Sequence, residues 1–286
     1  MKVGVIGAGA WGTALAIVSA HGGADVTLWS YDGEYKEFDN VEFPQNIKLT
    51  ANMADLHDMD TWLIVTPGAF FRETMRKARD EYNGQPIIIC TKGAENTTGQ
   101  FMSEILQTEI PECVDFGVLS GPQFAAEVAQ GVPTGSTLAG TEKAIVAGQG
   151  ALNKLYLEIS SDVIGTQVCG VGKNAVALIC GYNTVKCSEN ERALVFTRAW
   201  NEVMAIGIAM GGHMRSFLGL CGIGDLFLSA TSVTSRNFAG GMAIANGNPP
   251  HGTVEGVYAL GGLIARAYDL GIDVPVLIEM QKKLNL

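Results

Sequence analysis

The N-terminal part of the chain alternates between short apolar runs and glycine-rich turns. Lys2–Ile6 is an apolar run that ends at a glycine, as expected of a strand buried on both faces of a parallel sheet. Ala10–Ala20 has small and apolar residues at helical spacing, and two glycines follow it. Ala24–Trp29 then has the composition of a second strand. Strand, glycine turn, helix and strand in this order predict one βαβ unit.

Further apolar runs of strand length continue this alternation. A helical stretch is expected at Phe70–Tyr82 between the first two of them. The expected strands are Trp62–Thr66, Pro86–Cys90 and Phe116–Leu119. Strands that alternate with helices predict an α/β fold with a doubly wound parallel sheet.

The pattern changes after about Asp162. From Gly165 to Gly211 the residues predict long helices rich in Ala, Val, Leu and Met, with a break near Cys187–Asn190. Shorter helical segments follow, separated by Gly and Pro: Ser235–Asn246, Val254–Leu270 and Val274–Leu284. We therefore predict an α/β domain over residues 1–165 and an all-helical domain over residues 166–286.

Composition and charge restrict the class of protein. Hydrophobic residues make up 47% and charged residues 17% of the chain, which is typical of a globular protein. The formal net charge of −10 argues against a nucleic-acid partner, because affinity for a phosphate backbone needs clustered Lys and Arg. A small phosphorylated substrate needs only a few local cations, so it stays compatible with this charge.

The cysteine, histidine and apolar patterns bear on thiol state, metal binding and cellular compartment. The six cysteines form no C-x-x-C pair and the four histidines lie far apart, so we expect reduced thiols and no metal site. No charged leader precedes the first strand, and we expect Gly and polar residues to interrupt each apolar run before it reaches the length of a membrane span. These patterns predict a cytoplasmic protein.

The sequence Gly7-Ala8-Gly9-Ala10-Trp11-Gly12 lies at the turn between the first strand and the first helix. The first glycine permits a tight turn, the second lets the backbone approach a pyrophosphate, and the third allows the helix to pack closely on the strand. Such a motif also occurs as an ordinary glycine-rich turn. Its position between strand and helix is what predicts a dinucleotide site, with anion binding at the helix N-terminus.

The residues after the second strand bear on the choice of cofactor. Asp32 lies slightly beyond the usual position for binding a ribose 2′-hydroxyl. No Arg is nearby to bind a 2′-phosphate, and Lys36 is the closest cation in the sequence. This pattern favours NAD only mildly, because Asp32 is also typical of a residue that caps its own loop.

Three further stretches place charged residues in unusual contexts. Lys92 follows an apolar strand, at the sheet edge where ligands of open α/β folds bind. Lys173 lies in an otherwise apolar helix, where a lysine is costly unless it points into a polar cleft. Asp225 and Arg236 lie close together in the helical half. Each residue also has a structural interpretation: Lys92 as a loop cation, Lys173 as a lysine that extends to the surface, and Asp225 as a helix cap. These interpretations do not explain why all three stretches occur together with a dinucleotide loop.

With these motifs the sequence resembles the bacterial-type NAD(P)-dependent glycerol-3-phosphate dehydrogenases. The matching stretches run in the family's order: Val5–Leu15, Thr91-Lys92-Gly93, Ser120–Glu127, Asp162–Gly165, Lys173-Asn174, Gly222–Leu226, Ser235-Arg236-Asn237 and Val254-Glu255-Gly256. The resemblance implies a Rossmann-type dinucleotide-binding domain followed by a helical substrate-binding domain. It also implies NAD or NADP as cofactor, dihydroxyacetone phosphate as substrate, a role in glycerophospholipid synthesis and a homodimer.

The resemblance implies roles for individual residues as well. Lys173 matches the catalytic acid/base, and Lys92 and Asp225 match the other catalytic positions. The positions that match cofactor contacts are Gly7, Gly9, Ala10, Trp11, Gly12, Tyr31, Lys92, Ala125, Arg236, Thr253 and Glu255. The positions that match substrate contacts are Lys92, Gly121, Gln123, Lys173, Asp225, Ser235, Arg236 and Asn237.

Two departures from the family pattern stand out. The segment from Asp32 to Pro44 is shorter than usual, and Gln123 replaces the commoner Thr or Ser. Two other functions remain alternatives. One is a related dehydrogenase that acts on a β-hydroxy acid or 6-phosphogluconate, but the Ser120-Gly121-Pro122 stretch fits it less well. The other is a dinucleotide sensor without turnover, which has no need for a proton donor such as Lys173.

Overall fold

The computed structural model describes residues 1–95, 98–252 and 254–286. These residues form two compact units. The first consists of Met1–Lys92, Gln100–Leu119 and Gln123–Val163, and the second of Gly93–Gly99, Ser120–Pro122 and Ile164–Leu286. Two short segments that follow strands of the sheet thus belong to the helical unit, although the chain returns to the sheet after each of them.

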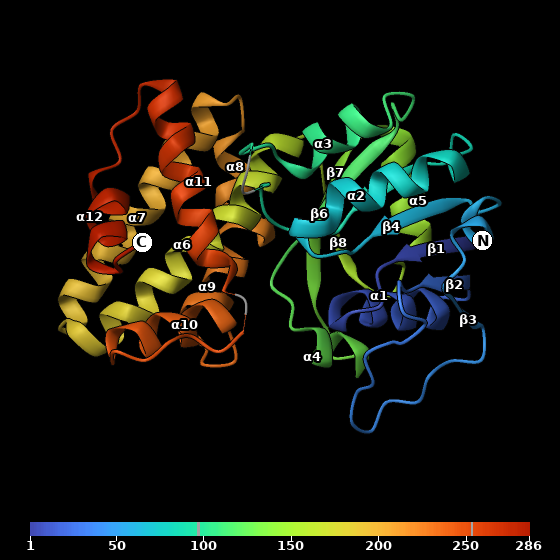
Figure 1. Cartoon of the computed structure of the whole chain (residues 1–286), viewed down its shortest axis with the longest axis horizontal. Coiled ribbons are helices and arrows are strands. Elements are labelled where there is room, and N and C mark those ends of the chain that lie inside the picture. The colour runs from blue at the N-terminus through green and yellow to red at the C-terminus, as the bar shows by residue number, and fades with distance from the viewer. Residues whose placement is uncertain (96–97, 253) are drawn as a thin grey trace. The chain divides into compact units, whose positions relative to one another are not determined.

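The first unit contains one sheet of eight strands in its described part, in the order β3-β2-β1-β4-β5-β6-β7-β8 (Figure 1). The strands are β1 (Lys2–Ile6), β2 (Asp25–Trp29), β3 (Ile47–Thr50), β4 (Thr61–Ile64), β5 (Ile87–Ile89), β6 (Phe116–Ser120), β7 (Gly135–Gly140) and β8 (Tyr156–Ser160). The neighbouring strands β3, β2, β1, β4, β5 and β6 are all paired in parallel. The strand order reverses between β1 and β4, so the predicted doubly wound sheet is confirmed.

Strand β7 approaches β6 from the opposite direction. The Thr141 amide, just after β7, donates to the Phe116 carbonyl at the start of β6 (3.2 Å). The end of one strand therefore lies beside the start of the other, and the two run antiparallel. Strand β8 is parallel to β7. The first residues of β7 consequently lie at the edge where β1, β4, β5 and β6 end, which is the edge that binds ligands in open α/β sheets.

Helices cover both faces of this sheet. They are α1 (Ala10–His21), α2 (Gly68–Ala78), α3 (Met102–Glu109), α4 (Ala125–Ala129) and α5 (Glu142–Ala151), with short 3₁₀ turns at Met53–Leu56 and Arg79–Glu81. Val3 and Val5 of β1 belong to the core cluster that includes α1, whereas Ile6 belongs to the cluster that includes α2 and α3. Because side chains alternate across a strand and both faces are buried, these strands appear in the sequence as unbroken apolar runs.

An ion-pair network joins α2 to α3. The Glu109 carboxylate contacts Arg72 Nη1 at 2.5 Å through Oε1 and Arg76 Nε at 2.8 Å through Oε2. Burial acts to raise the pKa of Glu109, but the hydrogen bonds and charges of Arg76 and Arg72 outweigh it, so the pKa lies below its ordinary value. Glu109 is therefore ionised at neutral pH and holds the two helices together.

The second unit is helical in its described part. Its helices are α6 (Val163–Lys186), α7 (Glu189–Ala209), α8 (Met214–Leu218), α9 (Asp225–Thr231), α10 (Arg236–Ala245), α11 (Glu255–Leu270) and α12 (Pro275–Lys283), and a π-helical segment (Leu220–Gly224) precedes α9. The break between α6 and α7 occurs at Ser188, whose hydroxyl accepts from the Glu191 amide and caps α7. Glu202 of α7 accepts the Val276 and Leu277 amides at 2.9 Å each, which caps α12 from another helix.

Helix α6 departs from one sequence expectation. By length and composition it is apolar enough to cross a membrane, with a mean hydropathy of 1.4 over its best window, although interruption of every such run was expected. Of that window 83% is buried inside the protein, as in the core helix of a soluble protein. The Gly and polar residues of α6 lie in one long helix, as the sequence predicted from Gly165 to the break near Cys187.

Candidate active site

The glycine turn after β1 combines a strained backbone with tight packing. Gly7 has φ +114°, a conformation that L side chains rarely adopt, and its amide donates to the Trp29 carbonyl at the end of β2 (3.0 Å). A Cβ at Gly12 would collide with the Gly7 carbonyl oxygen, whereas a Cβ at Gly9 would meet no described atom within 4 Å. The protein's own packing therefore requires Gly7 and Gly12, and Gly9 leaves open the space that a ligand needs.

Helix α1 presents its N-terminus at this turn. Its N-cap residue is Gly9, no side chain caps it, and no acidic residue lies in its first turn. The first N–H groups of a helix have no intrahelical partner, and together with the helix dipole they favour an anion. In the part of the chain that the structure describes, Trp11 Nε1 is buried without a hydrogen-bond partner. These features fit the pyrophosphate and neighbouring atoms of a dinucleotide cofactor.

The carboxyl end of β5 carries the Thr91-Lys92 pair. Thr91 Oγ1 donates to the Thr66 carbonyl oxygen at 2.8 Å, which joins the ends of β5 and β4. Lys92 is half-buried. Burial raises the pKa of the neighbouring Cys90 thiol, and the charge of Lys92 opposes that rise. The structure thus places Lys92 at the sheet edge that the sequence predicted.

Gln123 and Ala125 follow β6 in the first unit. Ser136, at the start of β7, donates its hydroxyl to Gln123 Oε1 at 2.6 Å. Gln123 Nε2 is buried and has no hydrogen-bond partner among the described residues. Ala125 is the first residue of α4 and packs against the core cluster that includes α1. The side chain of Gln123 is therefore oriented by Ser136, thirteen positions away, a contact that no local sequence pattern indicates.

Lys173 and Asp225 form a buried ion pair in the helical unit. Lys173 Nζ lies 3.2 Å from Asp225 Oδ1, and the two side chains are 13% and 2% exposed. Lys173 Nζ also donates to Ser229 Oγ at 3.0 Å, and Ser229 Oγ donates to Asp225 Oδ1 at 3.2 Å. Lys173 is thus held in place by two groups of α9 and does not extend to the surface. Ser229 lies one helical turn after Asp225, and this spacing is the sequence signal that could have indicated its role.

The start of α9 depends on an unusual backbone. Gly222 lies inside the π-helical segment with φ −92° and ψ −105°, outside the helical region. A Cβ at Gly222 would collide with the backbone of Phe217 in α8. This kink separates α8 from α9 and makes Asp225 the first residue of α9. Helical irregularities of this kind occur frequently at functional sites.

A second network links α6, α10 and α11. Asn174 Nδ2 donates to Glu255 Oε2 (3.1 Å), and Asn237 Nδ2 donates to Asn174 Oδ1 (2.8 Å). The Gly256 amide donates to Asn237 Oδ1 (2.8 Å). The structure therefore brings Glu255 and Asn237, which the sequence pointed to separately, into contact through the residue next to Lys173.

The remaining sequence-predicted residues differ in their surroundings. Ser235 accepts the Phe238 amide and caps α10, while Arg236, the first residue of that helix, is exposed. Gly121 is buried in its short segment of the helical unit. Tyr31 is 79% exposed, and Thr253 lies outside the described residues. No group of three metal-ligating side chains is found within the described ranges.

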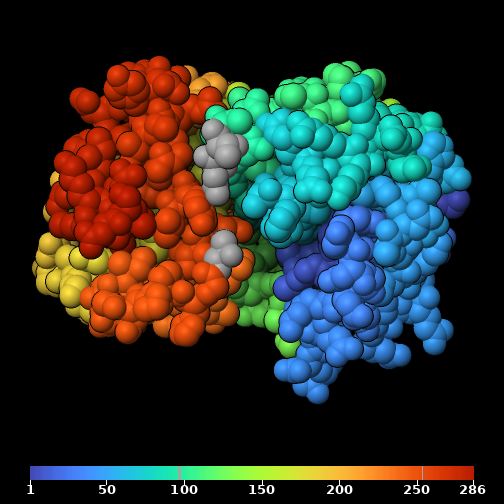
Figure 2. Space-filling view, in the orientation of Figure 1, coloured from blue at the N-terminus to red at the C-terminus, as the bar shows by residue number. Residues whose placement is uncertain are grey.

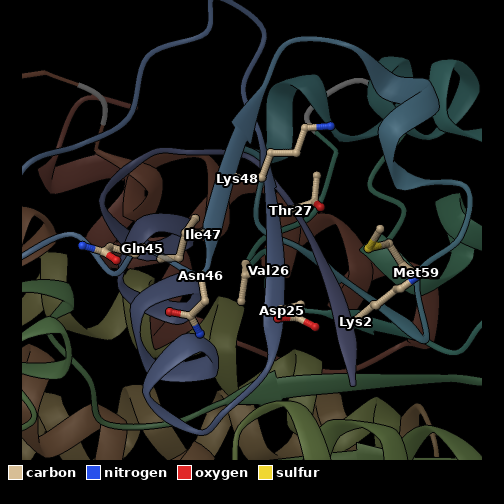
Figure 3. A pocket seen from close by; sticks show the side chains of 9 residues that line it. All are labelled: Lys2, Asp25, Val26, Thr27, Gln45, Asn46, Ile47, Lys48 and Met59. Carbon is tan, nitrogen blue, oxygen red and sulfur yellow. The ribbon is translucent and has the colours of Figure 1, made fainter.

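One hollow of the first unit lies away from these residues (Figure 3). Its volume is about 350 Å³. It is lined by Lys2, Asp25, Val26, Thr27, Gln45, Asn46, Ile47, Lys48 and Met59. These residues include the first residues of β1, β2 and β3, at the edge opposite to the glycine turn. Ligands of open α/β sheets bind at the carboxyl ends of the strands, so this hollow is not a candidate for the chemistry.

Comparison with known proteins identifies the family. Two family models, described as the N-terminus and the C-terminus of NAD-dependent glycerol-3-phosphate dehydrogenase, match residues 2–146 and 162–285. The chain belongs to this family. The match covers both the glycine turn and the Lys173–Asp225 pair.

Relatives within the glycerol-3-phosphate dehydrogenase family are similar over almost the whole chain. A protein of Parvibaculum lavamentivorans and one of Afipia carboxidovorans, both named glycerol-3-phosphate dehydrogenase (NAD(P)+), are 34% and 37% identical, and each alignment covers 96% of this chain and 89% of the relative. The crystal structure of glycerol-3-phosphate dehydrogenase from Coxiella burnetii matches with a TM-score of 0.89 and 29% identity, over 99% of this chain and 94% of that one. A D-mandelate dehydrogenase is 12% identical with a TM-score of 0.66 and shares the fold alone.

Proposed function

We propose that this dehydrogenase transfers a hydride reversibly between NAD(P)H and C2 of dihydroxyacetone phosphate, which gives sn-glycerol 3-phosphate and feeds glycerophospholipid synthesis. Membership of the family supports the reaction. The observation that carries the chemistry is the buried Lys173–Asp225 pair bridged by Ser229. A lysine held in this way inside an apolar helix suits a proton donor better than a structural cation.

The proton is the part of the reaction that this chain's own residues handle. When bound, the reduced nicotinamide supplies the hydride that C2 receives. Negative charge then develops on the C2 oxygen, and the Lys173 ammonium neutralises it by donating a proton from Nζ. In the reverse direction Lys173 accepts the proton from the C2 hydroxyl. Asp225 and Ser229 hold Nζ in position, while Lys92 acts as a second cation for cofactor and substrate.

We assign the phosphate of the substrate to the start of α10. Arg236 is exposed there, and a guanidinium binds phosphate with two parallel hydrogen bonds. The hydroxyl of Ser235 caps this helix, and Asn237 is anchored to Asn174 and Gly256, so both neighbours hold the backbone of Arg236 in place. Gly121 and Gln123 complete the proposed substrate contacts.

We assign the cofactor mainly to residues 1–165 and the substrate mainly to residues 166–286. The proposed cofactor contacts are Gly7, Gly9, Ala10, Trp11, Gly12, Tyr31, Lys92, Ala125, Arg236, Thr253 and Glu255. We further propose a cytoplasmic homodimer, which light scattering after size-exclusion chromatography tests directly. A monomer at all concentrations used in the assay would exclude the dimer.

One assay tests the proposed reaction. The purified protein is mixed with dihydroxyacetone phosphate and either NADH or NADPH, and the absorbance of the reduced cofactor is followed. We expect rapid consumption with at least one cofactor. Turnover restricted to a β-hydroxy acid or 6-phosphogluconate would show the related dehydrogenase instead. Cofactor binding without turnover on any of these substrates would show a sensor.

A further inference from the structure

A hydrogen bond between Gln123 and Ser136 joins the segment after β6 to the core of the sheet. Gln123 lies three residues after the end of β6, and Ser136 is the second residue of β7. Ser136 is fully buried, whereas helix α4, which begins two residues after Gln123, reaches the surface of the first unit, where it is green in Figure 2. The bond therefore fixes the Gln123 side chain at the edge of the sheet where β6 ends and β7 begins, which is the edge that binds ligands.

The length of this bond determines how the amide of Gln123 is turned. Ser136 Oγ lies 2.6 Å from Gln123 Oε1, which is typical of a bond between two oxygens and short for one that involves a nitrogen. Oε1 therefore faces Ser136 and accepts its hydroxyl. Nε2 is buried and has no hydrogen-bond partner among the described residues. With Oε1 already occupied, Gln123 offers a ligand the two N–H donors of Nε2.

These donors need an acceptor, because buried polar atoms in folded proteins almost always have a hydrogen-bond partner. Dihydroxyacetone phosphate carries oxygen acceptors in three groups: the phosphate, the C2 carbonyl and the C1 hydroxyl. Arg236 is assigned to the phosphate and Lys173 to the C2 oxygen. The C1 hydroxyl is the group that has no assigned partner, and its oxygen can accept from Nε2.

We propose that Gln123, held by Ser136, binds the C1 hydroxyl of the substrate and makes the enzyme select substrates that carry this group. Ser136 acts as a positioning residue, because without its hydroxyl the amide is free to turn and the Nε2 donor loses its fixed direction. Gln123 stands where Thr or Ser is commoner, and its longer side chain carries the donor farther from the backbone. The inference rests on the proposed function for the identity of the substrate.

A substrate that lacks one group tests this proposal. Hydroxyacetone phosphate differs from dihydroxyacetone phosphate only by the missing C1 hydroxyl, and the ratio of kcat/KM for the two substrates measures the selection. We expect the unaltered protein to prefer dihydroxyacetone phosphate by about tenfold or more, because a hydrogen bond and the buried donor that its loss leaves unpaired are together worth about that ratio. Gln123→Met keeps the length of the side chain and removes the donors, so most of this preference should disappear.

The role of Ser136 is tested by combining two variants. Ser136→Ala should lower the preference by about threefold or more, since the amide then loses its anchor. In the Gln123→Met background the same change should have no further effect on the preference, because Ser136 acts through Gln123. The preference is a ratio measured on one preparation, so it does not depend on how much of a variant is folded.

A matched control removes a buried hydroxyl from the next residue of the same strand. Thr137 is 2% exposed, its hydroxyl lies 3.2 Å from Glu158 Oε2 on β8, and successive side chains of a strand point to opposite faces. Thr137→Val should therefore leave the preference within about twofold of that of the unaltered protein.

Three results would overturn the inference while the proposed reaction stands: turnover of dihydroxyacetone phosphate without preference over hydroxyacetone phosphate, an unchanged preference in Gln123→Met, or an equal loss in Thr137→Val. An unchanged preference in Ser136→Ala would overturn the positioning role of Ser136. No turnover of dihydroxyacetone phosphate by the unaltered protein would instead refute the proposed reaction, and the inference with it.

Discussion

Replacing Lys173 with methionine separates its catalytic role from its structural one. Met keeps the length of the side chain but removes the charge and the proton. General acid–base catalysis contributes about 10²–10⁴-fold to turnover, so kcat should fall by that factor. The change also removes the ammonium that lies 3.2 Å from Asp225 Oδ1, and the Asp225 side chain is 2% exposed. Removing one partner of a buried ion pair costs about 3–5 kcal/mol, and because Ser229 still donates to Asp225 we expect the lower end, about 3 kcal/mol.

The double variant Lys173→Met/Asp225→Asn resolves the two effects. A neutral amide at position 225 needs no cation, so most of the lost free energy of unfolding should return. The turnover should not return, because no proton donor is restored. Urea unfolding gives the stability, and the absorbance of the reduced cofactor gives kcat. Fluorescence titration gives the Kd for the cofactor. This Kd should change less than about threefold, because the proposed proton transfer from Lys173 acts on the substrate. Recovery of kcat together with stability would refute the assignment of Lys173 as the proton donor.

Three further variants have distinct expected outcomes. Arg236→Ala should raise the KM for dihydroxyacetone phosphate about tenfold or more and leave kcat nearly unchanged, since it removes a charged phosphate contact; an unchanged KM would place the phosphate elsewhere. Glu202→Ala removes the cap of α12 and should lower the free energy of unfolding by about 1–2 kcal/mol, as measured in urea, with turnover unaffected at assay temperature. Glu109→Gln should destabilise the protein at neutral pH more than in acid. Arg76 and Arg72 lower the folded-state pKa of Glu109. Its contribution to the free energy of unfolding is therefore present above about pH 4.3 and is lost as the pH falls through the lowered pKa. If Glu109→Gln lowered the stability in urea equally at both pH values, this expected pH dependence would be contradicted.

The sequence predicted local features of the fold well. The strands β1 and β2 and the helix α1 between them follow from apolar periodicity and glycines that are adjacent in the chain. Strand β3 was missed because it is only four residues long and half polar, and β7 because glycine and polar residues fill it. The antiparallel direction of β7 depends on where the chain turns after β6, and no local sequence pattern specifies that turn. The long helix predicted from Gly165 onward is α6, in which Val203 of α7 and Phe238 of α10 pack against glycines that propensity alone penalises.

The amino-acid sequence by itself determined the glycine turn and the isolated lysine of α6, since both are patterns between neighbouring residues. Only the tertiary structure decided which groups hold that lysine: Ser229 and Asp225 lie more than fifty positions away, and helix packing brings them within 3.0 and 3.2 Å of Nζ. The same holds for Asp32, whose two interpretations the sequence left open. The structure shows it capping its loop through Oδ1 beside the glycine turn. Hydrogen bonds have a direction and a length, and only folded coordinates specify both.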